Sequence, residues 1–141
     1  MDTRSIERSA RRSIQFFLTL SAGLCAAIED WCRYDTIGPD GTTRRERNED
    51  FGRPELSPEI DVPEDGAHLW AIYHEVSSSI NRIHDGRCSP ISPVDFTAWV
   101  NLTGTIVSAD EYGILQDMDR AYIKGLNIEI AAYEAAAQQG H

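Results

Sequence analysis

The chain has 141 residues, a mass of 15.8 kDa and a formal net charge of −10, which fits one domain, or one domain with an extension. The acidic excess is concentrated in residues 51–141, which carry 5 basic against 14 acidic side chains. An acidic surface repels phosphate, so the composition argues against nucleic acid as a partner; it suits a basic protein partner, or it serves solubility alone.

The three cysteines predict structural thiols in a reducing compartment. Cys25, Cys32 and Cys88 form no CxxC pair, and an odd number offers no disulfide framework. Cys25 and Cys32 are seven residues apart, which places them on one face of a helix among apolar neighbours. We expect buried thiols rather than a redox or metal site.

Residues 1–34 predict one long helix, from Ser5 to about Tyr34. The part from Phe16 to Ile28 is apolar nearly all round. A helix that is apolar on every side is either central to a bundle or covered by another chain. We therefore expect this helix to pack on the rest of the chain or to oligomerise, and the candidate contacts with a second copy are Phe16, Phe17, Leu20 and Leu24.

The same region has the order of a signal peptide, because four arginines precede the apolar run and Arg11-Arg12 invites a twin-arginine interpretation. The run is interrupted by Thr19, Ser21 and Gly23, and it is well short of the roughly 20 residues that cross a bilayer. We expect no membrane association and a cytosolic packing helix, with export as the alternative.

Residues 35–64 predict an extended linker between the first helix and the rest of the chain. A turn signal at 38–41 is followed by a run of mixed charges at 44–50. Prolines then interrupt any regular structure at positions 54, 58 and 63. Such a segment buries little apolar surface to offset its ordering entropy, so we expect it to be extended or mobile.

Residues 65–141 predict a small domain of three helices, and the fold class is therefore all-α. The first helix is expected from Asp65 to Ile83, ending before Asp85-Gly86. The second runs from Pro93 to Leu102, with Ser92 as its N-cap and Gly104 closing it. The third begins with a capping box from Ser108 to Glu111 and reaches about Ala137. No strand is predicted.

No arrangement of residues in the sequence predicts catalysis. His68 and His74 lie on different faces of one helix, and His84 with Cys88 supplies two ligands where a structural zinc site needs four. The chain has no GxSxG, no phosphate-binding glycine loop and no HExxH. We expect no enzyme activity, no metal and no cofactor.

The aromatic residues of the three helices give the strongest functional signal. They fall on the expected apolar faces, where they form either a shared core or part of a docking groove for another protein. The candidate protein-binding residues are Trp70, Tyr73, Phe96, Trp99, Leu115, Met118 and Tyr122.

An ordered series of motifs in this region resembles phage tail assembly chaperones. Leu69-Trp70-Ala71-Ile72-Tyr73 stands where that family has an LWxxF helix, and Pro90-Ile91-Ser92 opens a helix with a central Trp99. Leu102-Thr103-Gly104 matches the LTG ending of that helix. The last helix carries Leu115, Met118, Asp119, Ala121 and Tyr122, close to the family pattern LxxLDxAYL. The resemblance covers about half of the chain, Pro63 to roughly Leu126, and the family pattern does not account for residues 1–34.

The resemblance implies a non-enzymatic morphogenesis protein in the cytoplasm of an infected bacterium. Its partners would be the tape measure protein and the tail-tube protein, with a second copy of the chain as a further candidate. Residues 1–34 would be a companion assembly segment or a feature of this phage alone. The alternatives are a structural tail or connector component that oligomerises through its N-terminal helix, and a bacterial adaptor or inhibitor unrelated to phage.

Overall fold

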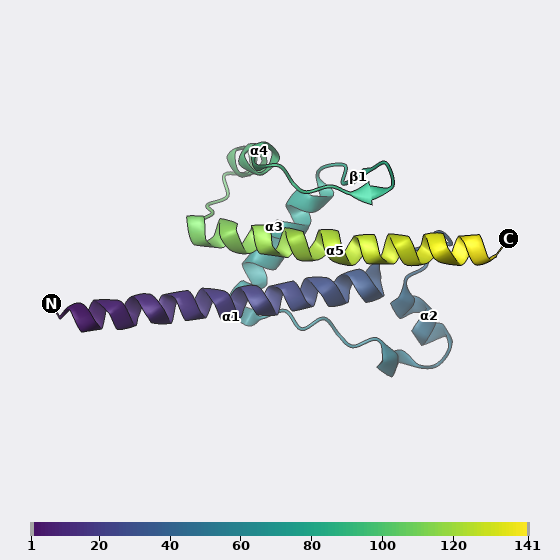
Figure 1. Cartoon of the computed structure of the whole chain (residues 1–141), viewed down its shortest axis with the longest axis horizontal. Helices are drawn as coiled ribbons and strands as arrows, with labels where there is room; N and C mark the ends of the chain where they lie inside the picture. Colours follow the sequence, from purple (N-terminus) through teal and green to yellow (C-terminus); the bar gives the residue numbers. More distant parts are fainter. Residues whose placement is uncertain (1, 141) are drawn as a thin grey trace.

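The computed structural model describes residues 2–140 and confirms an all-α chain with a long N-terminal helix (Figure 1). Two long helices, α1 and α5, form its axis, and shorter elements lie around them. The elements are α1 (Thr3–Asp35), α2 (Arg44–Asp50), the 3-10 turns η1 (Pro54–Leu56) and η2 (Glu64–Gly66), α3 (Ala67–Ser78), β1 (Ile83–His84), β2 (Arg87–Cys88), α4 (Pro93–Thr103) and α5 (Ala109–Gln139).

Helices α1 and α5 lie side by side and run in the same direction (Figure 1). Ser21 in α1 donates a hydrogen bond to Asp117 in α5. Further toward the C-terminal ends of both helices, Cys32 of α1 lies against Gly125 of α5. Helix α3 crosses this pair (Figure 1), and residues from all three helices share one hydrophobic core. The first helix therefore packs on the C-terminal region of its own chain.

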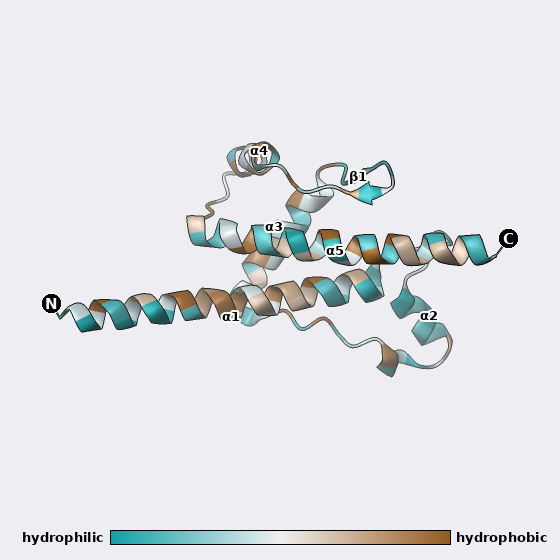
Figure 2. Cartoon of the chain, in the orientation of Figure 1, coloured by the Kyte–Doolittle hydropathy of each residue, from teal (hydrophilic) through white to brown (hydrophobic). Residues whose placement is uncertain are grey.

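The buried face of α1 explains why this helix is placed at the centre of the fold. Leu20, Leu24 and Ile28 recur every fourth residue, and Leu24 and Ile28 are fully buried. Burial of each such side chain contributes about 1.5–3 kcal/mol. The apolar stretch of α1 coincides with the part that crosses α3 and packs on α5 (Figure 2).

The N-terminal part of α1 extends beyond the beginning of α5 without contacting the core (Figure 1). Every residue from 2 to 16 is exposed. We call residues 3–16 the arm. Its exposed apolar side chains include Ile6 and Ile14, which are 54% and 59% exposed.

The helix caps expected from the sequence are confirmed. The Ser92 hydroxyl accepts from the Asp95 amide, Gly104 ends α4 in the left-handed region with φ 66°, and Ser108 with Glu111 forms a complete capping box. Ser92 and Ser108 each satisfy an N–H group that the first turn of a helix leaves without a partner.

The expected helix at 65–83 is too long, and the expectation that no strand forms is wrong at residues 83–88. Helix α3 ends at Ser78, and Ile83 pairs with Cys88 in a two-residue antiparallel hairpin. Asp85 and Gly86 have φ values of 52° and 74°, the left-handed pair that a tight hairpin turn needs.

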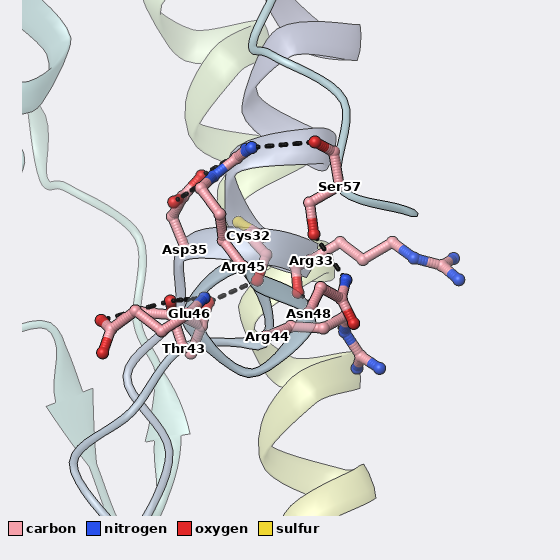
Figure 3. A network of polar contacts seen from close by, with 10 residues as sticks. Cys32, Arg33, Asp35, Thr43, Arg44, Arg45, Glu46, Asn48 and Ser57 are labelled. Carbon is pink, nitrogen blue, oxygen red and sulfur yellow. Dashed lines mark hydrogen bonds and ion pairs between the residues drawn. The ribbon is translucent and has the colours of Figure 1, made fainter. Parts of the chain in front are cut away.

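The linker expectation is also wrong for residues 44–50, which form α2. Thr43 caps this helix by accepting from the Glu46 amide, and Arg45 forms an ion pair with Asp35 at the end of α1 (Figure 3). The charged run thus gains partners on the neighbouring helix, and these contacts offset the entropy cost of ordering it.

A buried polar network holds the segment after α3 against α5. Asp119 accepts hydrogen bonds from the Tyr73 hydroxyl at 2.8 Å, from Arg82 Nη2 at 2.6 Å and from the Ile91 amide at 2.9 Å. Arg82 also donates to Ser77 and to the Ser89 carbonyl. Arg82 and Asp119 are each 6% exposed, so each charge depends on the other for compensation.

Substitution of two glycines in α5 tests the α1–α5 contact. A Cβ at Gly125 would lie 2.9 Å from Cys32 Cβ, whereas a Cβ at Gly113 would have nothing within 4 Å. Gly125→Ala is expected to lower the free energy of unfolding by about 1–3 kcal/mol, because overpacking outweighs the gain in helix propensity. Gly113→Ala is expected to raise it by up to about 1 kcal/mol. Urea unfolding followed by circular dichroism measures both, and a stabilised Gly125→Ala variant would contradict the close contact.

Substitution of two aspartates tests the buried network. Asp119→Asn leaves the Arg82 guanidinium buried without its counter-charge and is expected to lower the free energy of unfolding by about 3–5 kcal/mol. Asp110→Asn is the matched control, because Asp110 is exposed in the first turn of the same helix, and its effect should stay below about 1 kcal/mol. Equal effects of the two substitutions in urea unfolding would show that Arg82 is not buried against Asp119.

Candidate functional site

An open hollow of about 740 Å³ lies between the end of α1, helix α2, the segment around residue 60, and α3. Its wall is aromatic and consists of Trp31, Trp70 and His74, and its charged rim carries Asp35, Arg45, Glu49 and Glu59. We call it the aromatic hollow. It is the place where half-buried aromatic side chains meet a group of charges.

Helices α1 and α3 position the aromatic wall. The His74 ring meets the Trp31 ring at 4.7 Å and the Trp70 ring at 4.5 Å, both edge to face. Trp31 in turn stacks on Tyr122 of α5, with ring centroids 5.7 Å apart. Such contacts hold large side chains in one orientation while part of their surface remains open to a ligand.

His74 is a neutral member of this wall. Its Nε2 atom is buried and has no hydrogen-bond partner among the described residues. Burial lowers the pKa of His74 below the ordinary value of a histidine, because the imidazolium would lose its hydration between two indole rings. The wall therefore presents an apolar surface at neutral pH.

Arg45 fixes one side of the rim. Its guanidinium binds the Asp35 carboxylate through two hydrogen bonds of 2.9 and 3.1 Å and donates to the Ser57 carbonyl at 3.2 Å (Figure 3). The bond to Asp35 raises the pKa of Arg45, and Glu49 and Glu59 add to that effect. Three carboxylates around one guanidinium leave the rim with a net charge of −2.

The structure divides the candidate protein-binding residues between the core and the surface. Tyr73, Leu115 and Met118 are fully buried in the core of the chain, and Phe96 is 4% exposed at the bottom of a hollow between α4 and α5. Trp70 lies in the wall of the aromatic hollow, and the remaining two, Trp99 and Tyr122, are half-buried at the edge of the core.

The candidate contacts with a second copy divide in the same way. Leu20 and Leu24 are 7% and 0% exposed, because they pack inside their own chain against Gly66 and the core, so these two positions are a correction to the sequence-based set. Phe17 is half-buried against the core, and Phe16 is 47% exposed.

Sequence reasoning missed Trp31, His74 and the carboxylates of the rim as parts of one site. Trp31 lies in the expected first helix but after its apolar run 16–28. Its approach to α3 depends on how α1 crosses that helix, which no local pattern encodes. His74 follows Tyr73 directly, so its position next to a buried aromatic residue was the available signal.

The described residues contain no group of three or more histidine, cysteine or acidic side chains that would hold a metal ion. His84 faces Arg87 across the hairpin, so it does not meet Cys88 in the strand register. None of the helices between residues 2 and 140 combines the length and the apolar character required to cross a membrane.

Comparison of the chain with protein-family models, with curated proteins and with solved structures finds no match.

The buried His74 predicts a pH dependence of stability. With a folded-state pKa below the unfolded value of 6.5, the unfolded chain binds the proton first, so stability is complete above pH 6.5 and falls as the pH drops below it. His74→Phe removes this loss and the unpartnered Nε2, and it is expected to stabilise the protein by about 1 kcal/mol at acidic pH. Thermal unfolding of both proteins between pH 5 and about pH 8 measures the difference. Parallel pH profiles for the two proteins would contradict the assignment.

Proposed function

We propose that the protein is a non-enzymatic phage tail morphogenesis protein that binds the tape measure and tail-tube proteins during tail assembly in the bacterial cytoplasm. The carrying observation is that Trp70, in the segment that resembles the LWxxF helix of tail assembly chaperones, lies in the wall of the aromatic hollow. One residue of the ordered series therefore lies where a partner has access to it.

The chemistry of the aromatic hollow suits a basic amphipathic helix. Trp31 and Trp70 supply the large, rigid apolar contacts that carry most of the binding energy in protein interfaces. The carboxylates of Glu49 and Glu59 are exposed and form no ion pair within residues 2–140, so they are available to lysine or arginine. A helix of the tape measure protein would bind in the helix-in-groove mode, with apolar side chains against the indoles and cations at the rim.

The charged rim also favours a reversible complex, which a chaperone that leaves the finished tail requires. Charges at the edge of an interface raise the association rate more than the final affinity. The rim remains hydrated because the hollow is open, so ion pairs between the rim and a bound partner add little to the stability of the complex.

A structural tail or connector component is the second candidate, and the exposed arm of α1 favours it. A helix of about 14 residues that is exposed along its whole length is marginal in water, which suits a segment that joins a neighbouring subunit in a ring. The two candidates differ in where the protein ends up. A structural component remains in purified particles at a fixed stoichiometry, whereas a chaperone is absent from them.

Co-expression with the tape measure protein of the same genome tests the primary proposal. The wild-type chain is expected to raise the soluble fraction of that protein and to co-purify with it. Trp70→Ala is expected to weaken binding by about ten-fold or more, because it removes a central indole. The matched control is Phe51→Ala, since Phe51 is an aromatic residue outside the hollow and is 81% exposed. No gain in solubility with the wild-type chain would contradict the proposal, and equal effects of both substitutions would exclude the aromatic hollow as the binding site.

A further inference from the structure

Helix α1 has a second face that its own chain does not use. The face toward the core carries Leu20, Leu24 and Ile28. The outer face carries exposed residues that recur every three or four positions, the repeat with which two helices pack along each other. These exposed residues are Arg4, Glu7, Arg8, Arg11, Gln15, Leu18, Ala22, Ala26, Glu29 and Arg33.

The centre of the outer face is apolar and its ends are charged. Leu18 is 61% exposed, and Ala22 and Ala26 are exposed on the following turns. This surface accounts for the stretch from Phe16 to Ile28 being apolar nearly all round (Figure 2), although only one side of it is buried in the chain. Small residues at the centre allow a second helix to approach closely.

The charges on the outer face are self-complementary when two copies of α1 run antiparallel. Placing Leu18 of one copy opposite Ala22 of the other also places Arg11 opposite Glu29 and Glu7 opposite Arg33. Each pair occurs twice, because an antiparallel arrangement of identical helices has two-fold symmetry. The register thus brings together two apolar contacts and four pairs of opposite charge.

In this register, the arm of each copy reaches the groove between α1 and α5 of the other copy. That groove has a volume of about 310 Å³, and its lining includes Glu29, Asp30 and Ile128. Ile128 is 57% exposed, and Glu29 and Asp30 match the arginines of the arm. Arg33 in the same groove matches Glu7, and Lys124 lies on its α5 side. In the isolated chain every residue of the arm is exposed, and Ile14 near its end shares a hollow with the beginning of α5, so packing stabilises little of its helix.

The charge distribution also favours this packing of a second copy over two alternatives, which are pairing of the two arms alone and binding to an anionic membrane. Residues 2–15 carry four arginines against two acidic residues, while the remainder of the chain carries 9 basic against 21 acidic residues. Pairing of two arms alone would place arginines against arginines. An anionic membrane would attract the arm but repel the acidic body of the same chain.

We propose that the protein forms a two-fold symmetric dimer through antiparallel packing of the outer faces of α1, with Arg11 opposite Glu29 and each arm seated between α1 and α5 of the other copy. The dimer uses a surface separate from the aromatic hollow, so it stands independently of the proposed function.

Charge reversal tests the register. The wild-type chain is expected to sediment as a dimer at micromolar concentration. Arg11→Glu and Glu29→Arg are each expected to raise the dissociation constant by about ten-fold or more, and the double variant should restore most of the affinity, because the pair is rebuilt with the charges exchanged. Neither residue forms a salt bridge within the described chain, so both variants should fold. Folding is checked by circular dichroism.

Arg53→Glu is the matched control, because Arg53 is also exposed and forms no salt bridge among the described residues, but it lies outside α1. It is expected to leave the dissociation constant within about two-fold of the wild type. Leu18→Asp provides a second route, since it places a charge at the apolar centre and should yield monomers. A wild-type monomer at all concentrations would overturn the proposal. So would equal effects of Arg11→Glu and Arg53→Glu, or a double variant that binds no more tightly than the single ones.

Discussion

The close packing of α1 along α5 is the contact on which the rest of the structure depends. Gly125 lets the backbone of α5 approach Cys32, and Gly66 lets the beginning of α3 approach Leu20 and Leu24. Burial in this contact raises the pKa of the Cys32 thiol to about 12, so the group is a neutral part of the core. With α1 fixed in this way, Trp31 comes to lie against α3, and the end of α1 supplies Asp35 to Arg45.

Two consequences of this packing occupy opposite parts of α1. At its C-terminal end, α1 lines the aromatic hollow together with α2, residues 59–62 and α3. At its N-terminal end it continues beyond the core as an arm that is exposed throughout. The same helix thus contributes to two different surfaces. The aromatic hollow suits a basic helix of another protein, and the outer face with the arm suits a second copy of the chain.

Local signals in the sequence were sufficient for the helices and their caps. Ser92, Gly104 and the pair Ser108 and Glu111 determine helix ends through their own backbone contacts, so they were predictable. The error at residues 79–88 arose because Arg82 is drawn to Asp119, a partner 37 positions away. Helix α2 was missed for a similar reason, since its charges are satisfied by Asp35 and Ser57. The aromatic hollow combines residues from four separate segments, and only Trp70 was identified among them.

The central claim is that α1 belongs to the core from about Leu20 onward while its arm does not. Hydrogen exchange at each amide of the dilute protein tests this claim most directly, because exchange free energies report local opening. The account predicts that amides 20–32 are protected to the same free energy as amides 114–125 of α5, while amides 3–16 of the monomer exchange almost freely. A much lower opening free energy for amides 20–32 than for amides 114–125 would contradict the account, because α1 would then detach while the core stays folded.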